Sequence, residues 1–159
     1  MRKRGADVGG RCFTFRMDIA DPQTVFPKIV ATVLDTTDAR RLAEFYRELL
    51  GYSYFPGDEP PADSGPDDAD WLRLREPGGA FRLSFQQVEK LDPPTWPEGP
   101  VPQQLHLDFA VGSAAELQRQ KARALELGAT LLRDRFDDPD EPLFVFADPA
   151  GHPFCIFVG

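Results

Sequence analysis

The sequence predicts one α+β domain made of two β-α-β-β-β modules, which form a cupped mixed sheet with the helices on its convex face. Three observations support this fold class. Two amphipathic helical segments, residues 39–50 and 114–127, are each followed by a glycine. Each segment follows one short apolar run typical of a strand and precedes three more. A similar turn, residues 76–79 and 148–151, precedes the last run of each half, which indicates an internal repeat.

The first module begins with a β-branched, apolar run over residues 29–34, which predicts a strand. Thr37 or Asp38 can cap the helix that follows, and Gly51 ends it in a position that favours a left-handed residue. The apolar helical positions, spaced by three and four residues, are Ala39, Leu42, Ala43, Tyr46, Leu49 and Leu50. The three further strands are expected over residues 52–55, 71–75 and 81–88.

The second module repeats this order after a proline-rich connector, residues 91–102, which cannot form a helix or a central strand. Ser113 and Glu116 have the spacing of a capping box, which predicts the start of the second helix. The expected strands are residues 105–111, 129–133, 143–147 and 154–158. We therefore expect one domain over residues 27–159, with modules at about 27–90 and 103–159.

Residues 1–26 show no periodic apolar pattern and are expected to be an N-terminal arm or extension. Five of the first 16 residues are Arg or Lys. One interpretation is an extension upstream of a native start at Met17. The other is a short arm that docks on a partner subunit through residues 12–15.

Composition excludes several classes of protein. Apolar residues make up 42% of the 159 residues, which excludes a disordered chain. The net charge of −8 opposes binding to nucleic acid. No apolar run approaches the roughly 20 residues of a membrane helix, and no apolar signal-peptide core follows the basic start, so we expect a cytoplasmic protein. Cys12 and Cys155 are expected to be free thiols, and the acidic stretches 58–70 and 134–141 to be solvated loops.

Three motifs resemble the vicinal oxygen chelate superfamily, which includes glyoxalase I, extradiol dioxygenases, fosfomycin-resistance enzymes and bleomycin-binding proteins. Residues 45–52, FYRELLGY, resemble its characteristic helix end, and residues 148–154, DPAGHPF, resemble its turn before the last strand. Residues 93–97 and 103–108 are similar to the glyoxalase-like subfamily common in actinobacteria. The resemblance covers about residues 27–159. It implies paired modules, a small-molecule pocket in the cup and, often, a homodimer.

The resemblance also implies four metal-ligand positions, which fall on Ala31, Leu83, His106 and Cys155. Alanine and leucine have no donor atoms, and a histidine with a cysteine is too few for a catalytic site. Gln86 or Asp108 could add a third ligand. We therefore expect no cofactor, with a divalent metal at His106 and Cys155 as the alternative.

Strand alternation sorts the residues that would line the cup. His106 and Asp108 share a face with Gln104, and the pair is expected to be catalytic, with Asp108 fixing the tautomer or raising the pKa of a general base at His106. The alternative is a former ligand position that now holds a satisfied polar contact. His152 is expected to be solvated in its turn. The other expected ligand-binding residues are Trp96, as a lid or as a peg closing the core, Arg73, Phe85, Phe157 and Cys155, with Leu83 beside them.

These residues predict a glyoxalase-like protein that binds a small organic molecule without a catalytic metal. It would either sequester the molecule, as in resistance, or perform metal-independent acid-base chemistry at His106. The alternative is a metal-dependent lyase, isomerase or dioxygenase with an incomplete ligand set. A third interpretation is a non-catalytic module that regulates or scaffolds a partner. The expected partners are a small-molecule ligand and a second copy of the chain, with no nucleic acid and no membrane.

Overall fold

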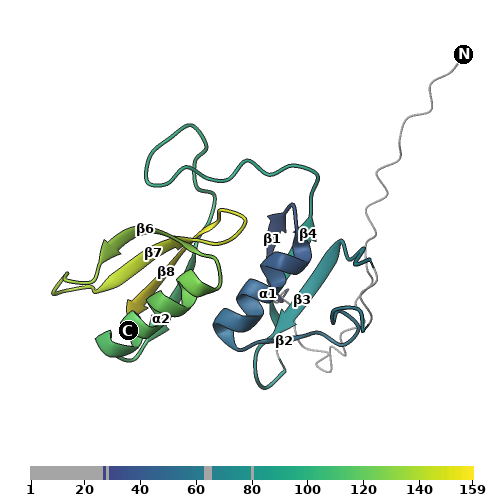
Figure 1. Ribbon diagram of the computed structural model, residues 1–159, viewed down its shortest axis with the longest axis horizontal. Coiled ribbons are helices and arrows are strands. Elements are labelled where there is room, and N and C mark those ends of the chain that lie inside the picture. Colours follow the sequence, from purple (N-terminus) through teal and green to yellow (C-terminus); the bar gives the residue numbers. More distant parts are fainter. Residues whose placement is uncertain (1–26, 28, 63–65, 80) are drawn as a thin grey trace, which may run out of the picture.

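The computed structural model describes residues 27, 29–62, 66–79 and 81–159, and it confirms the two modules (Figure 1). The expected arm over residues 1–26 lies outside the described residues. The first module consists of β1 (Thr32–Thr36), α1 (Ala39–Leu50), β2 (Ser53–Tyr54), β3 (Trp71–Arg75) and β4 (Phe81–Gln87). The second consists of β5 (Leu107–Val111), α2 (Ala114–Glu126), β6 (Thr130–Arg135), β7 (Leu143–Ala147) and β8 (Pro153–Val158).

Each module has a four-stranded mixed sheet with the same strand order. The first sheet runs β1-β4-β3-β2 and the second β5-β8-β7-β6. In both, the first and last strands of the module pair in parallel, and the other neighbours are antiparallel. The repeat predicted from the sequence is therefore present in the topology.

Both helices begin at the capping residues that the sequence indicates. The Asp38 carboxylate accepts a hydrogen bond from the Arg41 amide, and Gly51 ends α1 with φ of 67°. At α2 the Ser113 hydroxyl accepts from the Glu116 amide at 3.2 Å, but the Glu116 carboxylate bonds to Arg119 in place of the cap, so only half of the expected capping box forms. Neither helix of the described chain has the length and apolar character needed to cross a membrane.

The first strands of the two modules are shorter at their start than the sequence predicts. The β1 ladder begins where Thr32 pairs with Leu83, so Ile29 and Val30 precede it, and Ile29 is 95% exposed. Similarly, β5 begins at Leu107 and leaves Leu105 outside the sheet. Apolar β-branched residues alone do not make a strand when the neighbouring strand offers them no partner.

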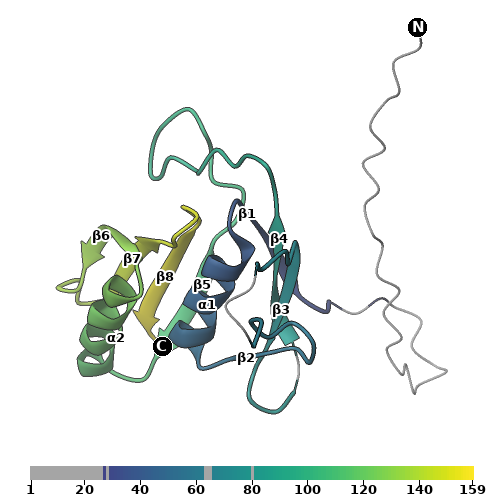
Figure 2. The ribbon, with the colours of Figure 1, turned by 45° about the vertical axis from the view of Figure 1, so that its right-hand side comes forward.

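One hydrophobic core serves both modules, because α1 lies between the two sheets (Figures 1 and 2). The Tyr46 ring stacks on Phe85 of the first sheet, with centroids 5.8 Å apart, and meets Phe154 of the second sheet edge-on at 6.4 Å. The Arg123 guanidinium of α2 donates to the Leu49 carbonyl at the end of α1. The helix-facing side of each sheet therefore points into this core, and the other side points away from it.

A buried carboxylate joins the two modules within this core. The Asp148 side chain is fully buried and accepts a hydrogen bond from the Tyr46 hydroxyl at 2.9 Å. It also accepts from the backbone amides of Ala150 and His152, at 2.9 and 3.0 Å, and lies 2.9 Å from His152 Nδ1. Burial and this carboxylate raise the pKa of Tyr46 well above its ordinary value, so the phenol remains a donor. Several donors thus offset the desolvation of one buried charge.

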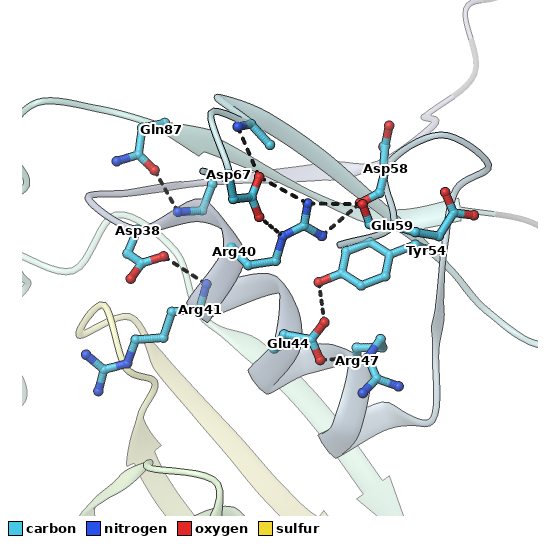
Figure 3. A network of polar contacts seen from close by, with 12 residues as sticks. Asp38, Arg40, Arg41, Glu44, Arg47, Tyr54, Asp58, Glu59, Asp67 and Gln87 are labelled. Atoms are coloured by element: carbon cyan, nitrogen blue, oxygen red, sulfur yellow. Dashed lines mark hydrogen bonds and ion pairs between the residues drawn. The ribbon is translucent and has the colours of Figure 1, made fainter. Parts of the chain in front are cut away.

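Described residues of the first acidic stretch contact Arg40 of α1 (Figure 3), and Asp58 also pairs with Arg73 of β3. Arg40 donates to the Asp67 carboxylate at 2.6 Å and to the Asp58 carbonyl at 2.8 Å. Arg73 forms a two-pronged pair with the Asp58 carboxylate at 2.7 and 2.9 Å. The Gln87 amide oxygen accepts from the first amide of α1, on Ala39, at 2.7 Å. These acids therefore hold the loop against the first module.

Replacing Tyr46 by phenylalanine should lower the free energy of unfolding by about 2 kcal/mol, since a buried carboxylate loses a donor and water cannot replace it. Tyr54→Phe is the matched control, because its hydroxyl bonds to the partly exposed Glu44 at 2.7 Å, and it should cost about 1 kcal/mol or less. Urea unfolding measures both. Equal losses in the two variants would contradict the joining role of Asp148.

Candidate functional site

The candidate site lies on the side of the second sheet that faces away from the core, which we call the open face. Alternation places Phe154 and Ile156 in the core and leaves Cys155 and Phe157 on the open face. The strand registers align one row across this face: Asp108, Cys155, Val145 and Arg133. The next row is Ala110, Phe157, Leu143 and Arg135.

A chain of polar contacts crosses one edge of the open face. The Gln103 amide nitrogen lies 2.8 Å from His106 Nδ1, and His106 Nε2 lies 3.5 Å from the Asp108 carboxylate. The Cys155 thiol also hydrogen-bonds to Asp108. The side chains of His106 and Asp108 are 45% and 56% exposed. The structure thus brings together the two residues that the sequence suggested as a pair, in a position open to solvent.

The contacts define which group can move a proton. When Gln103 donates to Nδ1, the neutral imidazole of His106 carries its proton on Nε2 and directs it toward Asp108. The carboxylate then accepts a hydrogen bond from the thiol, while the imidazole nitrogen lies 3.5 Å away, longer than an ordinary hydrogen bond. The imidazole is therefore arranged as a donor, and Asp108 is the acceptor. The Gln103 amide oxygen is buried without a hydrogen-bond partner among the described residues, an acceptor left over in this chain.

Cys155 is arranged as a thiol and not as a nucleophile. Burial, and then the charge and hydrogen bond of Asp108, raise the pKa of Cys155 to about 11. At neutral pH the sulfur is therefore protonated and donates to the carboxylate. A nucleophilic or metal-binding cysteine needs the thiolate, which this environment disfavours.

The residues of one chain do not fit the divalent metal that the superfamily resemblance implies. Ala31 has no donor atom, and Leu83 lies in the core. His106 and Cys155 are the two donors that remain at the four positions. Among the described residues no three His, Cys, Asp or Glu side chains gather as a metal-ligand group. The donor set falls short of the three protein ligands of a catalytic zinc site.

In the first sheet, the expectation that Phe85 and Leu83 line the pocket is wrong. Both are buried in the core, where Phe85 stacks on Tyr46. Their neighbours Ser84 and Gln86 lie on the opposite face of β4. Arg73 lies on that face as well, but its guanidinium is paired with Asp58 and covers the Phe55 ring at 4.1 Å. Arg73 is therefore held by its own chain.

Trp96 lies over the far edge of the open face and not in the core. The Arg133 guanidinium of β6 stacks on its ring at 4.9 Å from the centroid. The indole also lines a cavity of about 590 Å³ between the connector and the ends of β6 and β7. Trp96 is not part of the core cluster, so the interpretation of a peg closing the core is wrong, and the lid remains a prediction.

Two further residues were assigned from the sequence. Gln104 is exposed and bonds locally to the Pro102 carbonyl, outside the polar chain. The expectation of a solvated His152 is wrong, because its side chain is 13% exposed and bonds to Asp148. Sequence reasoning missed Gln103 and Arg133. Gln103 is three residues before His106, and Arg133 is one arginine beside the acidic stretch 134–141, so the sequence alone gave only a weak signal for either.

The comparisons with known proteins agree with this fold. Residues 31–157 match the family model described as "Glyoxalase-like domain". That match spans most of the chain, and the chain therefore belongs to the glyoxalase-like domain family. No curated protein sequence matches the chain.

Solved structures show the same fold at low identity. A glyoxalase/bleomycin resistance protein/dioxygenase family enzyme from Burkholderia phytofirmans is 16% identical, with a TM-score of 0.57, over 81% of this chain and 96% of its own. A fosfomycin resistance protein from Mesorhizobium loti is also 16% identical, with a TM-score of 0.57, over 84% and 92%. A lactoylglutathione lyase from Agrobacterium tumefaciens is 18% identical, with a TM-score of 0.53, over 87% and 96%.

Alkylation by iodoacetamide at pH 8 should be slow at Cys155, measured in a Cys12→Ser background. With a pKa of about 11, roughly 0.1% of the thiol is ionised, against about 10% at the ordinary value of 9. Asp108→Asn should accelerate alkylation several-fold, because it removes a negative charge and an acceptor. Burial remains, so the rate should stay below that of an exposed thiol. Glu141→Gln is the control, because Glu141 contributes least to the raised pKa of Cys155, and it should change the alkylation rate least. If Cys155 of the otherwise unmodified chain reacts as fast as a free thiol, this account is wrong.

Gly151 has a contact that distinguishes it from an otherwise similar glycine. A Cβ at Gly151 would lie 2.4 Å from Pro93 Cβ, whereas a Cβ at Gly128 meets nothing within 4 Å, and φ is 98° and 104° at the two. Both alanine variants should lose about 1 kcal/mol of unfolding free energy because of the positive φ. Gly151→Ala should lose about 1–3 kcal/mol more through the clash. In a Trp71→Phe background, Gly151→Ala should shift the fluorescence emission of Trp96 and Gly128→Ala should not. Equal losses of unfolding free energy and equal emission spectra in the two variants would show that Pro93 moves freely.

Proposed function

We propose that this protein binds a small organic molecule on the open face of its second sheet, with the His106–Asp108 pair as the recognising group and without a catalytic metal. The observation that carries the proposal is the polar chain from Gln103 to Cys155, which ends in an exposed imidazole and carboxylate. Beside it lie three apolar side chains, of which Phe157 is partly exposed and Val145 and Leu143 are buried. An apolar floor with a few convergent polar groups is typical of small-molecule sites.

The dimensions of this face suit a ligand of moderate size. Neighbouring strands lie about 4.8 Å apart, so Asp108 on β5 and Arg133 on β6 are separated by roughly 14 Å across the sheet. Two or three fused rings are shorter than that width, so a ligand that contacts both residues needs a side arm beyond its rings. The solved structures of similar fold include, by their titles, a fosfomycin resistance protein and a lactoylglutathione lyase, so proteins of this fold act on or protect against small organic molecules.

The polar pair is compatible with binding and with acid-base chemistry. His106 offers a proton from Nε2, and Asp108 can accept one, so a ligand with adjacent donor and acceptor groups can replace their mutual contact of 3.5 Å. In a sequestering protein the ligand only replaces this contact, and no proton transfer follows. In an enzyme, the same two groups would transfer a proton to and from a carbon or oxygen of the bound molecule. We favour sequestration, since the thiol beside the carboxylate is held unreactive.

We further propose that the protein works as a homodimer in the cytoplasm. Among the described residues, β1 and β5 are each an edge strand of their sheet, and apolar residues lie along them. Val33 on β1 is 39% exposed, and Leu105 before β5 is 40% exposed. A second copy that pairs with one of these edges would cover both the backbone groups and the apolar side chains. It would also add a wall to the open face.

His106→Ala should weaken ligand binding at least tenfold, because the variant loses the ligand's proton donor and leaves the Gln103 amide unpaired. A thermal-shift screen of small aromatic acids, amines and phenols against the unmodified chain supplies the test compounds. Titration calorimetry with the strongest of them then compares the two proteins. Sequestration predicts that the compound is recovered unchanged, whereas acid-base chemistry predicts conversion that stops in the variant.

Glu126→Ala, an exposed change on α2, is the control and should leave binding and melting temperature unchanged. If His106→Ala binds every compound as tightly as the unmodified protein does, the pair is not the recognising group. That outcome would support the interpretation of a former ligand position that now holds only a structural contact.

A further inference from the structure

The cavity beneath Trp96 has a wall that is fixed at three points. Pro93 packs against Gly151, where no side chain would fit. The Thr95 hydroxyl and amide both bond to the Val101 backbone, at 2.8 to 3.1 Å, which closes the connector into a loop. Trp96 is held against Arg133. These contacts fix the connector against the end of the second sheet, where it forms one wall of a pocket that is open to solvent.

The cavity belongs to the same face as the polar chain. Thr130 and Ala147, which line it, pair across β6 and β7, and Ala147 shares its face with Val145 in the row of Cys155. Its volume of about 590 Å³ lies within the range of small-molecule pockets. The ring of Trp96 and the apolar side chains of Pro94 and Leu132 supply flat surfaces for stacking.

The charges around the cavity favour a cation. One exposed carboxylate, that of Glu98, lines the cavity, and the nearest cation among the described residues is the Arg133 guanidinium on the Trp96 ring. The buried Asp148 carboxylate lies behind the floor, and the chain as a whole carries a net charge of −8. The Trp96 ring already attracts one cation, the guanidinium of Arg133, with which no carboxylate of the described residues pairs. A ligand cation would use the same ring and the carboxylate of Glu98.

We infer that the cavity beneath Trp96 binds an organic cation with a flat ring, an arylalkylamine in chemical class, whose ring stacks on the indole and whose ammonium group pairs with Glu98. The inference rests on the proposed function and specifies its ligand class. The part of the molecule beyond the ring would extend along the row from Arg133 toward Asp108, where the second carboxylate of the face lies.

The test uses two probes with the same ring and opposite charge, 1-naphthylmethylammonium and 1-naphthoate, titrated calorimetrically into the full chain at pH 7.5 in low salt. The ammonium probe should bind at least fivefold tighter than the carboxylate. Glu98→Gln should weaken the ammonium probe about two- to fivefold and leave the carboxylate probe unchanged or slightly tighter, and the loss should shrink at high salt. Glu89→Gln, which removes the same charge outside the cavity, should change neither.

A third variant separates the two charge preferences. Arg133→Gln frees the indole and should tighten the ammonium probe, because the competing guanidinium is gone. If the carboxylate probe binds tighter than the ammonium probe and is lost in Arg133→Gln, the cavity is an anion site and the inference is wrong. Binding of neither probe, or no effect of Glu98→Gln, also overturns it.

The same titrations keep the inference apart from the proposed function. His106→Ala should weaken the ammonium probe far less than Glu98→Gln does, since the probe does not span the face. A loss with His106→Ala and none with Glu98→Gln would leave His106 as the recognising group and overturn the cavity. If Glu98→Gln weakens the ammonium probe and His106→Ala weakens neither this probe nor any larger ligand, the cavity remains the binding site and the proposed function is overturned.

Discussion

The buried carboxylate of Asp148 is the interaction on which the rest of the structure depends. It lies in the last turn of the second module, and yet its most distant partner in sequence, Tyr46, comes from the helix of the first. Burying a carboxylate away from water costs folding free energy unless hydrogen-bond donors surround it. Here the donors are a phenol, two amides of its own turn and an imidazole. The charge therefore fixes the position of α1 relative to the second sheet and the shape of the turn together.

The connector and the open face follow from that turn. Gly151 belongs to it and gives Pro93 a place to pack, which brings Trp96 over β6. The strand that leaves the turn carries Cys155 to the middle of the open face, beside Asp108. A single buried polar cluster thus connects the shared core with both parts of the candidate site. The polar chain at His106 and the cavity beneath Trp96 lie at opposite edges of one sheet whose apolar middle separates them.

The sequence predicted the fold class well, because local signals decide it. Caps, helical spacing and glycine stops mark both helices, and the paired turns mark the repeat. It predicted the faces of the second sheet correctly but failed in the first. Where β3 pairs with β4, Leu74 is opposite Leu83 but Arg75 is opposite Phe81, so β4 contains one extra residue after the turn. One extra residue exchanges the two faces of the strand that follows it. Leu83 and Phe85 therefore lie in the core, and Ser84 and Gln86 lie opposite. His152 bonds to Asp148, and Asp148 is buried against Tyr46 of a distant helix, a contact that no local pattern reveals.

Native mass spectrometry of the protein isolated from its own cells, with elemental analysis of the same sample, tests the central claim most directly. That claim is that the open face of the second sheet holds a small organic molecule and no catalytic metal. The account predicts an added mass of a few hundred daltons that is released on denaturation, and less than one-tenth of a divalent metal ion per chain. A stoichiometric divalent metal, with no organic mass, would contradict it and would point to the metal-dependent chemistry of the wider superfamily.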